Sequence, residues 1–97
     1  MAISSTRNIV FGSQFPAGTV ATQLHDSSFF VRSLTILAPS SNSDRVRIGS
    51  STVIADSVQG LKPGTEIKLE TDQAMNLTDI YIANVSGGDG VTFYGTR

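Results

Sequence analysis

The sequence predicts an all-β protein, and two observations support this. Sixteen Val and Ile, ten Thr and seven aromatic residues make up about a third of the 97-residue chain, and these residue types are enriched in strands. Gly, Pro, Asn and Ser interrupt the sequence at short intervals, as expected when short strands alternate with turns. We therefore expect a small antiparallel β-sandwich, jelly-roll-like, of seven or eight short strands, with a small β-barrel as the alternative.

The first half of the chain predicts four strands. Residues 8–11 form a short apolar strand, and residues 18–24 alternate apolar and polar side chains. Residues 29–38 form the longest predicted strand, and they carry apolar residues on both sides. This pattern indicates burial between two layers or contact with another subunit. After the polar loop 39–44, residues 45–48 alternate again.

The second half is more regular. Residues 51–55 are apolar enough for a strand. In residues 62–65, Pro63 followed by Gly64 specifies a type II turn. Residues 66–70 alternate strictly, with the charged side chains facing outward.

The last strands are predicted at residues 77–85, with Ile80 and Ile82 facing the core, and at residues 91–94, with Val91 and Phe93 facing inward. A glycine-rich hairpin turn is predicted at residues 86–90 between them. The two windows that could be helical, residues 50–57 and 72–77, are too short for a stable isolated helix.

The length of the chain predicts one folded domain, at residues 9–97. Residues 1–8 are polar and show no periodicity, so we expect a flexible N-terminal arm that orders only against a partner.

The charge balance excludes several classes of partner. Seven basic and eight acidic residues give a net charge of -1, so neither nucleic acid nor an anionic membrane is expected to bind. No apolar run approaches the roughly 18 to 20 residues of a membrane span, and the first residues lack the apolar region of a signal peptide. We expect the chain to be made in a cytoplasm and used without export. The absence of cysteine from the sequence excludes disulfides, thiol catalysis and Cys-zinc sites.

The sequence also predicts no catalytic, cofactor-binding or metal-binding residues. His25 and Asp26 lie next to two serines, but adjacent residues cannot assemble the spatial relay of a catalytic triad. Glu66 and Glu70 would lie about 13 Å apart on a strand, too far for a glycosidase pair. A single histidine without cysteine disfavours transition metals. Asp89, in a glycine-rich segment, is explained by turn geometry.

Large apolar residues are abundant near the start of the chain. Seven of them give more apolar surface on both faces of the strands than a chain of this size is expected to bury, namely Ile9, Val10, Phe11, Phe15, Phe29, Phe30 and Val31. We take Phe11, Phe15, Phe29 and Phe30 as candidates for a protein interface. The alternative is that the two sheets bury all of them.

Four segments of the second half resemble small virion proteins of tailed bacteriophages. They are RVRIGSSTV at 45–53, GLKPGTEIKL at 60–69, NLTDIYI at 76–82 and GVTFY at 90–94. The resemblance covers residues 45–95, about half of the chain, and residues 1–44 do not share the pattern. It implies a β-sandwich module of a phage particle, either a head decoration (cement) protein, a head-fibre base or a tail component. Such modules have no catalytic residues to transfer to this chain.

The resemblance leads us to expect a non-enzymatic capsid decoration protein on the head surface of a virion, present in the host cytoplasm during assembly. Its expected partners are further copies of itself, most simply as a homotrimer, and the major capsid protein or another virion protein. The alternative is a tail- or fibre-associated module that binds a receptor or glycan through exposed Tyr81, Tyr94 or Asn84.

Overall fold

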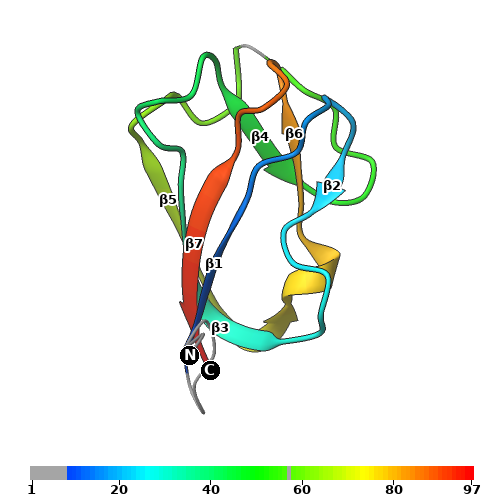
Figure 1. The fold of residues 1–97 in the computed structure, drawn as a ribbon. Coiled ribbons are helices and arrows are strands. Elements are labelled where there is room, and N and C mark those ends of the chain that lie inside the picture. The colour runs from blue at the N-terminus through cyan, green and yellow to red at the C-terminus, as the bar shows by residue number, and fades with distance from the viewer. Residues whose placement is uncertain (1–8, 57) are drawn as a thin grey trace.

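The computed structural model describes residues 9–56 and 58–97, and over these residues the protein is all-β. Seven strands and one short 3₁₀ turn form two antiparallel sheets that pack face to face as a small β-sandwich (Figure 1). The elements are β1 (Ile9–Gln14), β2 (Thr22–Gln23), β3 (Phe30–Leu37), β4 (Val46–Gly49), β5 (Glu66–Asn76), η1 (Leu77–Asp79), β6 (Tyr81–Asn84) and β7 (Val91–Thr96).

The strand order is that of a jelly roll. One sheet has the order β1-β7-β3-β5 and the other β2-β6-β4. An eight-stranded jelly roll places the first, eighth, third and sixth strands in one sheet and the second, seventh, fourth and fifth in the other. The observed order agrees if the fifth strand is reduced to the single bridge between Val46 and Leu61. Each strand pairs only within its own sheet, which favours the sandwich over the barrel.

The core lies between the sheets and draws on both of them. The inward positions of β6 and β7 are those that the sequence predicted, because Ile82, Val91 and Phe93 are buried. The ten residues of the buried apolar cluster are Val10, Leu24, Val31, Leu34, Ile36, Val46, Leu77, Ile82, Val91 and Phe93.

An irregularity in the pairing of β3 with β5 explains the apolar residues on both sides of β3. Val31 pairs with Met75, but Ser33 pairs with Glu70, so four residues of β5 lie opposite Arg32 alone. Val31 and Leu34 are both completely buried, although strict alternation would place them on opposite faces. The alternation in β3 therefore changes phase at this bulge. The longest strand is β5, with 11 residues, and not the predicted strand at 29–38.

Three further predictions about strands are wrong. Residues 51–55 form turns and irregular structure instead of a strand. The strand at 18–24 is reduced to Thr22–Gln23, and the strand at 77–85 begins with the 3₁₀ turn. In the third case Asn76 caps the turn, because its side-chain oxygen accepts hydrogen bonds from the Thr78 N–H at 3.2 Å and from the distant Phe29 N–H at 3.3 Å.

The glycine-rich segment 86–90 does not close a hairpin. It carries the chain from β6 in the three-stranded sheet to β7 in the four-stranded sheet. Turn residues alone cannot distinguish these two connections. The predicted type II turn is confirmed, because Gly64 has a φ of 85° and the Thr65 N–H donates to the Lys62 carbonyl at 3.1 Å.

Candidate interaction surface

The outward face of the four-stranded sheet carries an apolar cluster. Cross-strand register places Phe11 opposite Tyr94, and Tyr94 opposite Thr35. Phe11 on β1 is 39% exposed and Tyr94 on β7 is 56% exposed, whereas Thr35 on β3 is only 5% exposed. Neighbouring large side chains therefore cover the middle of this face, and their own outer surfaces face solvent.

These residues line a shallow hollow of about 520 Å³ that is open to solvent. Leu37, 37% exposed, adds an aliphatic wall, and Glu66 at the start of β5 contributes a carboxylate to the lining. We call this depression the outer-face hollow, and define it by Phe11, Ser13, Thr35, Leu37, Thr92 and Tyr94.

The four phenylalanines predicted as interface residues lie in different surroundings. Phe11 lines the outer-face hollow, and Phe15, just beyond β1, is 45% exposed. Phe30 is 50% exposed and lines a second hollow with Arg32, Ala74 and Arg97. Phe29 is partly buried against the core.

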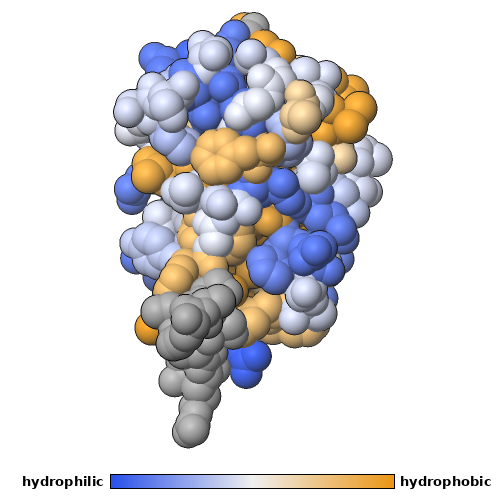
Figure 2. Space-filling model, in the orientation of Figure 1, coloured by the Kyte–Doolittle hydropathy of each residue, from blue (hydrophilic) through white to orange (hydrophobic). Residues whose placement is uncertain are grey.

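The ring of Phe29 is also covered by a cation. The Arg97 guanidinium carbon lies 4.5 Å from the centre of this ring, which is a cation–π geometry. Exposed apolar surface is thus divided among several places, and Figure 2 shows apolar side chains separated by hydrophilic ones on the face it displays.

The loop that joins β4 to β5 presents two further apolar side chains. Ile54 is 76% exposed and Val58 is 74% exposed. Between them, the Asp56 carboxylate accepts the backbone N–H groups of Val58 at 2.7 Å and Gln59 at 3.3 Å, and it forms an ion pair with Arg47 at 3.5 Å. The hydrogen bond from Val58 is the main cause that lowers the pKa of Asp56, and Arg47 adds to it.

A buried polar network holds the loops at one end of the sandwich together. The Asp89 carboxylate accepts the backbone N–H groups of Ser43 at 2.8 Å and Asp44 at 2.9 Å. Asn42 donates from its side-chain amide to the Gly90 carbonyl at 2.8 Å and accepts the Gly90 N–H at 3.1 Å. Asp89, which sequence reasoning assigned to the turn alone, therefore joins segments more than forty residues apart.

Asn84 belongs to the same network and is not an exposed sugar ligand. It is 1% exposed, and its side-chain N–H group donates to the carbonyls of Asp89 at 2.7 Å and Pro16 at 3.3 Å. The expectation that Asn84 is an exposed hydrogen-bonding residue is therefore wrong. Of the two tyrosines proposed with it, Tyr94 is well exposed and Tyr81 is half-buried.

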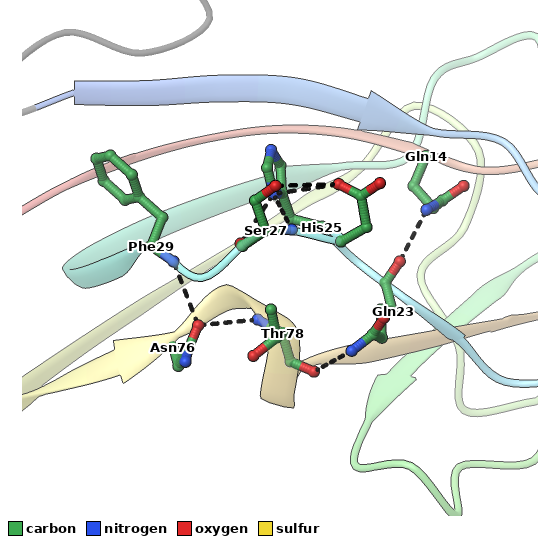
Figure 3. A network of polar contacts seen from close by, with 8 residues as sticks. Gln14, Gln23, His25, Ser27, Phe29, Asn76 and Thr78 are labelled. Atoms are coloured by element: carbon green, nitrogen blue, oxygen red, sulfur yellow. Dashed lines mark hydrogen bonds and ion pairs between the residues drawn. The ribbon is translucent and has the colours of Figure 1, made fainter.

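His25 and its neighbours form a local turn structure (Figure 3). The His25 Nδ1 lies 3.0 Å from the backbone nitrogen of Ser27, and the Ser27 hydroxyl approaches the Asp26 carboxylate at 3.5 Å. The His25 ring packs edge-on against Phe93, with 6.1 Å between the ring centres. The serine hydroxyl thus lies against the carboxylate and not against the imidazole, which is unlike the order of a triad.

Figure 3 also shows how the polar side chains link the two sheets. The Gln14 side-chain amide donates to the Gln23 carbonyl at 2.8 Å, and the Gln23 side chain donates to the Thr78 carbonyl at 3.1 Å. Strand β1 is thereby joined to β2 and to the turn η1. These contacts hold the edge of the four-stranded sheet in place.

Residues 9–56 and 58–97 contain no group of three or more His, Cys, Asp or Glu that could hold a metal ion. Within the same residues no helix is long and apolar enough to cross a membrane. Comparison of the chain with protein-family models, curated proteins and solved structures gives no match.

Proposed function

We propose that the chain is a non-enzymatic structural protein of a phage virion, and specifically a decoration protein that binds the outer surface of the head shell. One observation carries the proposal: a small β-sandwich exposes apolar side chains at separate places, namely the outer-face hollow, the β4–β5 loop and the Phe30 hollow. A protein that bridges shell subunits needs more than one contact surface. The resemblance of residues 45–95 to small virion proteins supports the same function.

The physical role of such a protein is to stabilise the shell by binding it. A ligand that binds the assembled state, and not the dissociated state, shifts the equilibrium toward assembly. Many copies on one shell add their effects, and an oligomer that engages several sites binds more tightly than each single contact does. Because the surface is nearly neutral overall, with a net charge of -1, binding is expected to depend on apolar contact and not on long-range attraction.

The three exposed apolar surfaces have two roles in this proposal. The outer-face hollow and the β4–β5 loop serve contacts between copies, with a homotrimer as the expected assembly. The Phe30 hollow serves the contact with the shell. There, Arg32 and Arg97 flank the exposed ring of Phe30, so this surface suits an apolar residue accompanied by a carboxylate.

Immunogold electron microscopy of purified particles tests the location. We expect label on the head surface, and we expect heads that lack the protein to recover heat resistance when the purified chain is added. Phe30→Ser should reduce the occupancy on heads without changing the solution mass of the protein. Label confined to the tail, or absent from the particle, would contradict the proposal.

The receptor-binding alternative predicts a different experimental result. Tyr94 in the outer-face hollow remains an exposed aromatic platform, so a glycan-binding module should give a glycan-array signal that Tyr94→Ala abolishes. A decoration protein should give no such signal.

A further inference from the structure

We propose that two copies of this chain pair along the free edge of β5, antiparallel and related by a two-fold axis that passes between their Ile67 residues. The pairing joins two four-stranded sheets into one sheet that continues across both copies. The partner is a second copy of this chain, because the charges and the apolar residue at this edge are self-complementary in one register. This inference goes beyond the proposed function, which gives the edge of β5 no role.

Strand β5 is an edge strand whose outer backbone groups are open. It is the last strand in the order β1-β7-β3-β5, it has 11 residues, and Figure 1 shows it at the side of the sandwich. Just before it, the Thr65 carbonyl accepts the Ala38 N–H at 2.9 Å, so the Thr65 carbonyl points toward the β3 side. Backbone groups of successive residues in an antiparallel strand point to opposite sides. Those of Glu66, Lys68 and Glu70 therefore point away from β3 and can pair with another strand.

The core side of this edge leaves an apolar side chain in water. Ile67 pairs with Ile36, which is completely buried, so both side chains lie on the core face of the sheet. Ile67 is nevertheless 38% exposed, because no strand lies beyond β5 to cover it. In the proposed pairing each Ile67 lies opposite the Ile67 of the second copy, with Cβ atoms about 4.5 to 5.5 Å apart. Each copy thus covers the open edge of the other's core.

Charges on the outward face of β5 alternate in sign. Glu66, Lys68 and Glu70 are exposed, and among the described residues none of them has an ion-pair partner. With the axis at Ile67, the Glu66 of each copy lies opposite the Lys68 of the other. Glu70 lies opposite Gly64, which carries no charge. Opposite charges directly across two strands stabilise their pairing, so a second copy supplies the charges that this edge requires.

The same charges disfavour the neighbouring two-fold registers. An axis at Lys68 would place this residue opposite its own copy and Glu66 opposite Glu70. An axis at Leu69 would place Glu66 opposite Asp72, and this like-charge pair offsets the gain from Lys68 opposite Glu70. Like charges directly opposite are destabilising. Edge charges also oppose pairing with an unrelated strand, so they favour a specific partner in a specific register.

The solution mass, measured by light scattering after size exclusion, tests the pairing. We expect twice 10.3 kDa, or a higher even multiple where the trimer of the proposed function also forms. A monomer or a trimer at millimolar concentration overturns the proposal.

Two charge reversals test the register. Lys68→Glu and Glu66→Lys each place like charges across the contact, so each variant should lose half of the wild-type mass. Glu70→Lys is the matched control, because it makes the same change of charge on the same face but lies opposite Gly64, and its mass should stay that of the wild type. Thermal unfolding of each variant checks that it is folded. Dissociation by the control, or a Glu66→Lys variant that stays paired, overturns the register.

A mixing experiment then shows that the two residues meet across the axis. In a mixed pair of Lys68→Glu and Glu66→Lys, both charged contacts again join opposite charges, with their signs reversed. We expect the mixture to recover the wild-type mass, although neither variant does so alone. A mixture that keeps the halved mass overturns the two-fold contact.

Hydrogen exchange locates the contact on the backbone. The Glu66 N–H points away from β3, so it should exchange slowly in the wild-type protein and faster in Lys68→Glu. The Ile67 N–H points toward β3 and should be protected in both proteins. Equal exchange of the Glu66 N–H in the two proteins would contradict pairing at this edge. None of these measurements involves the virion, so their failure is distinguishable from a failure of the decoration role.

Discussion

Val46 and Leu61 exchange two backbone hydrogen bonds across the base of the β4–β5 loop and so form an isolated antiparallel β-bridge. The Val46 N–H donates to the Leu61 carbonyl at 3.1 Å, and the Leu61 N–H donates to the Val46 carbonyl at 2.7 Å. This isolated bridge stands where a jelly roll has a full strand. Reducing that strand to one residue pair releases the preceding residues from the sheet, and so creates the loop that exposes Ile54 and Val58.

Substitution of Gly60, next to this bridge, tests how closely the chain around residue 60 packs against Arg45 and Val46. A Cβ at this position would lie 2.9 Å from the Arg45 Cβ and 3.0 Å from the Val46 carbonyl. We expect Gly60→Ala to lower the free energy of unfolding by about 1 to 3 kcal/mol, measured by urea denaturation. Gly18→Ala is the control, because no atom lies within 4 Å of its added Cβ, and it should be neutral or slightly stabilising. Equal effects would show that the contact at Gly60 relaxes freely.

Asp89 is expected to be important for stability, although it lies in a loop. Asp89→Ala leaves the part-buried N–H groups of Ser43 and Asp44 without their acceptor, and a hydrogen bond to a charged group contributes about 1.5 to 3 kcal/mol. We predict a loss of about 2 kcal/mol or more in thermal or urea unfolding. Asp26→Ala, at a carboxylate that is 94% exposed, should change stability by less than about 0.5 kcal/mol. If the two variants had equal free energies of unfolding, the hydrogen bonds of Asp89 would not contribute to the stability of the fold.

The order of the β4–β5 loop should depend on pH through Asp56. The folded state lowers the pKa of this carboxyl group, chiefly through the hydrogen bond from Val58. The charged form therefore favours the ordered loop above the unfolded pKa of about 3.9. This contribution is lost as the pH falls through the lower, folded-state pKa. Hydrogen exchange and amide chemical shifts of Val58 and Gln59 should report the transition.

The matched variant for that measurement is Asp56→Asn, which keeps an oxygen acceptor but cannot titrate. Its Val58 and Gln59 amides should show no transition over the same acidic range. A transition of equal size in the variant would mean that another group controls the loop.

Phe29 and Phe30 are adjacent in sequence, but we expect different results from their substitution. Phe29 packs on the core beneath Arg97, so Phe29→Ser should lower the free energy of unfolding by about 2 to 4 kcal/mol. Phe30 is half exposed, so Phe30→Ser should leave unfolding nearly unchanged and act on partner binding. Thermal unfolding of the two variants checks this, and a larger loss of stability for Phe30→Ser would contradict the assignment.

The sequence by itself determined the all-β class, the inward positions of Phe93 and Ile82, and the turn at Gly64. These features depend on local chemistry, namely side-chain alternation and the φ that glycine tolerates. The abundance of aromatic residues near the start also pointed to Phe11, which lines the outer-face hollow.

Only the tertiary structure decided which sheet each strand joins, and so which surfaces exist. Residues 86–90 look like a hairpin turn but cross between sheets, and Asn84 looks like a surface amide but is buried by contacts to Pro16 and Asp89. The loop carrying Ile54 was predicted as a strand because its residues favour strands, yet pairing at Val46 and Leu61 leaves it outside the sheet. Strand order and loop anchoring depend on contacts between distant residues, and periodicity along the chain carries no record of them.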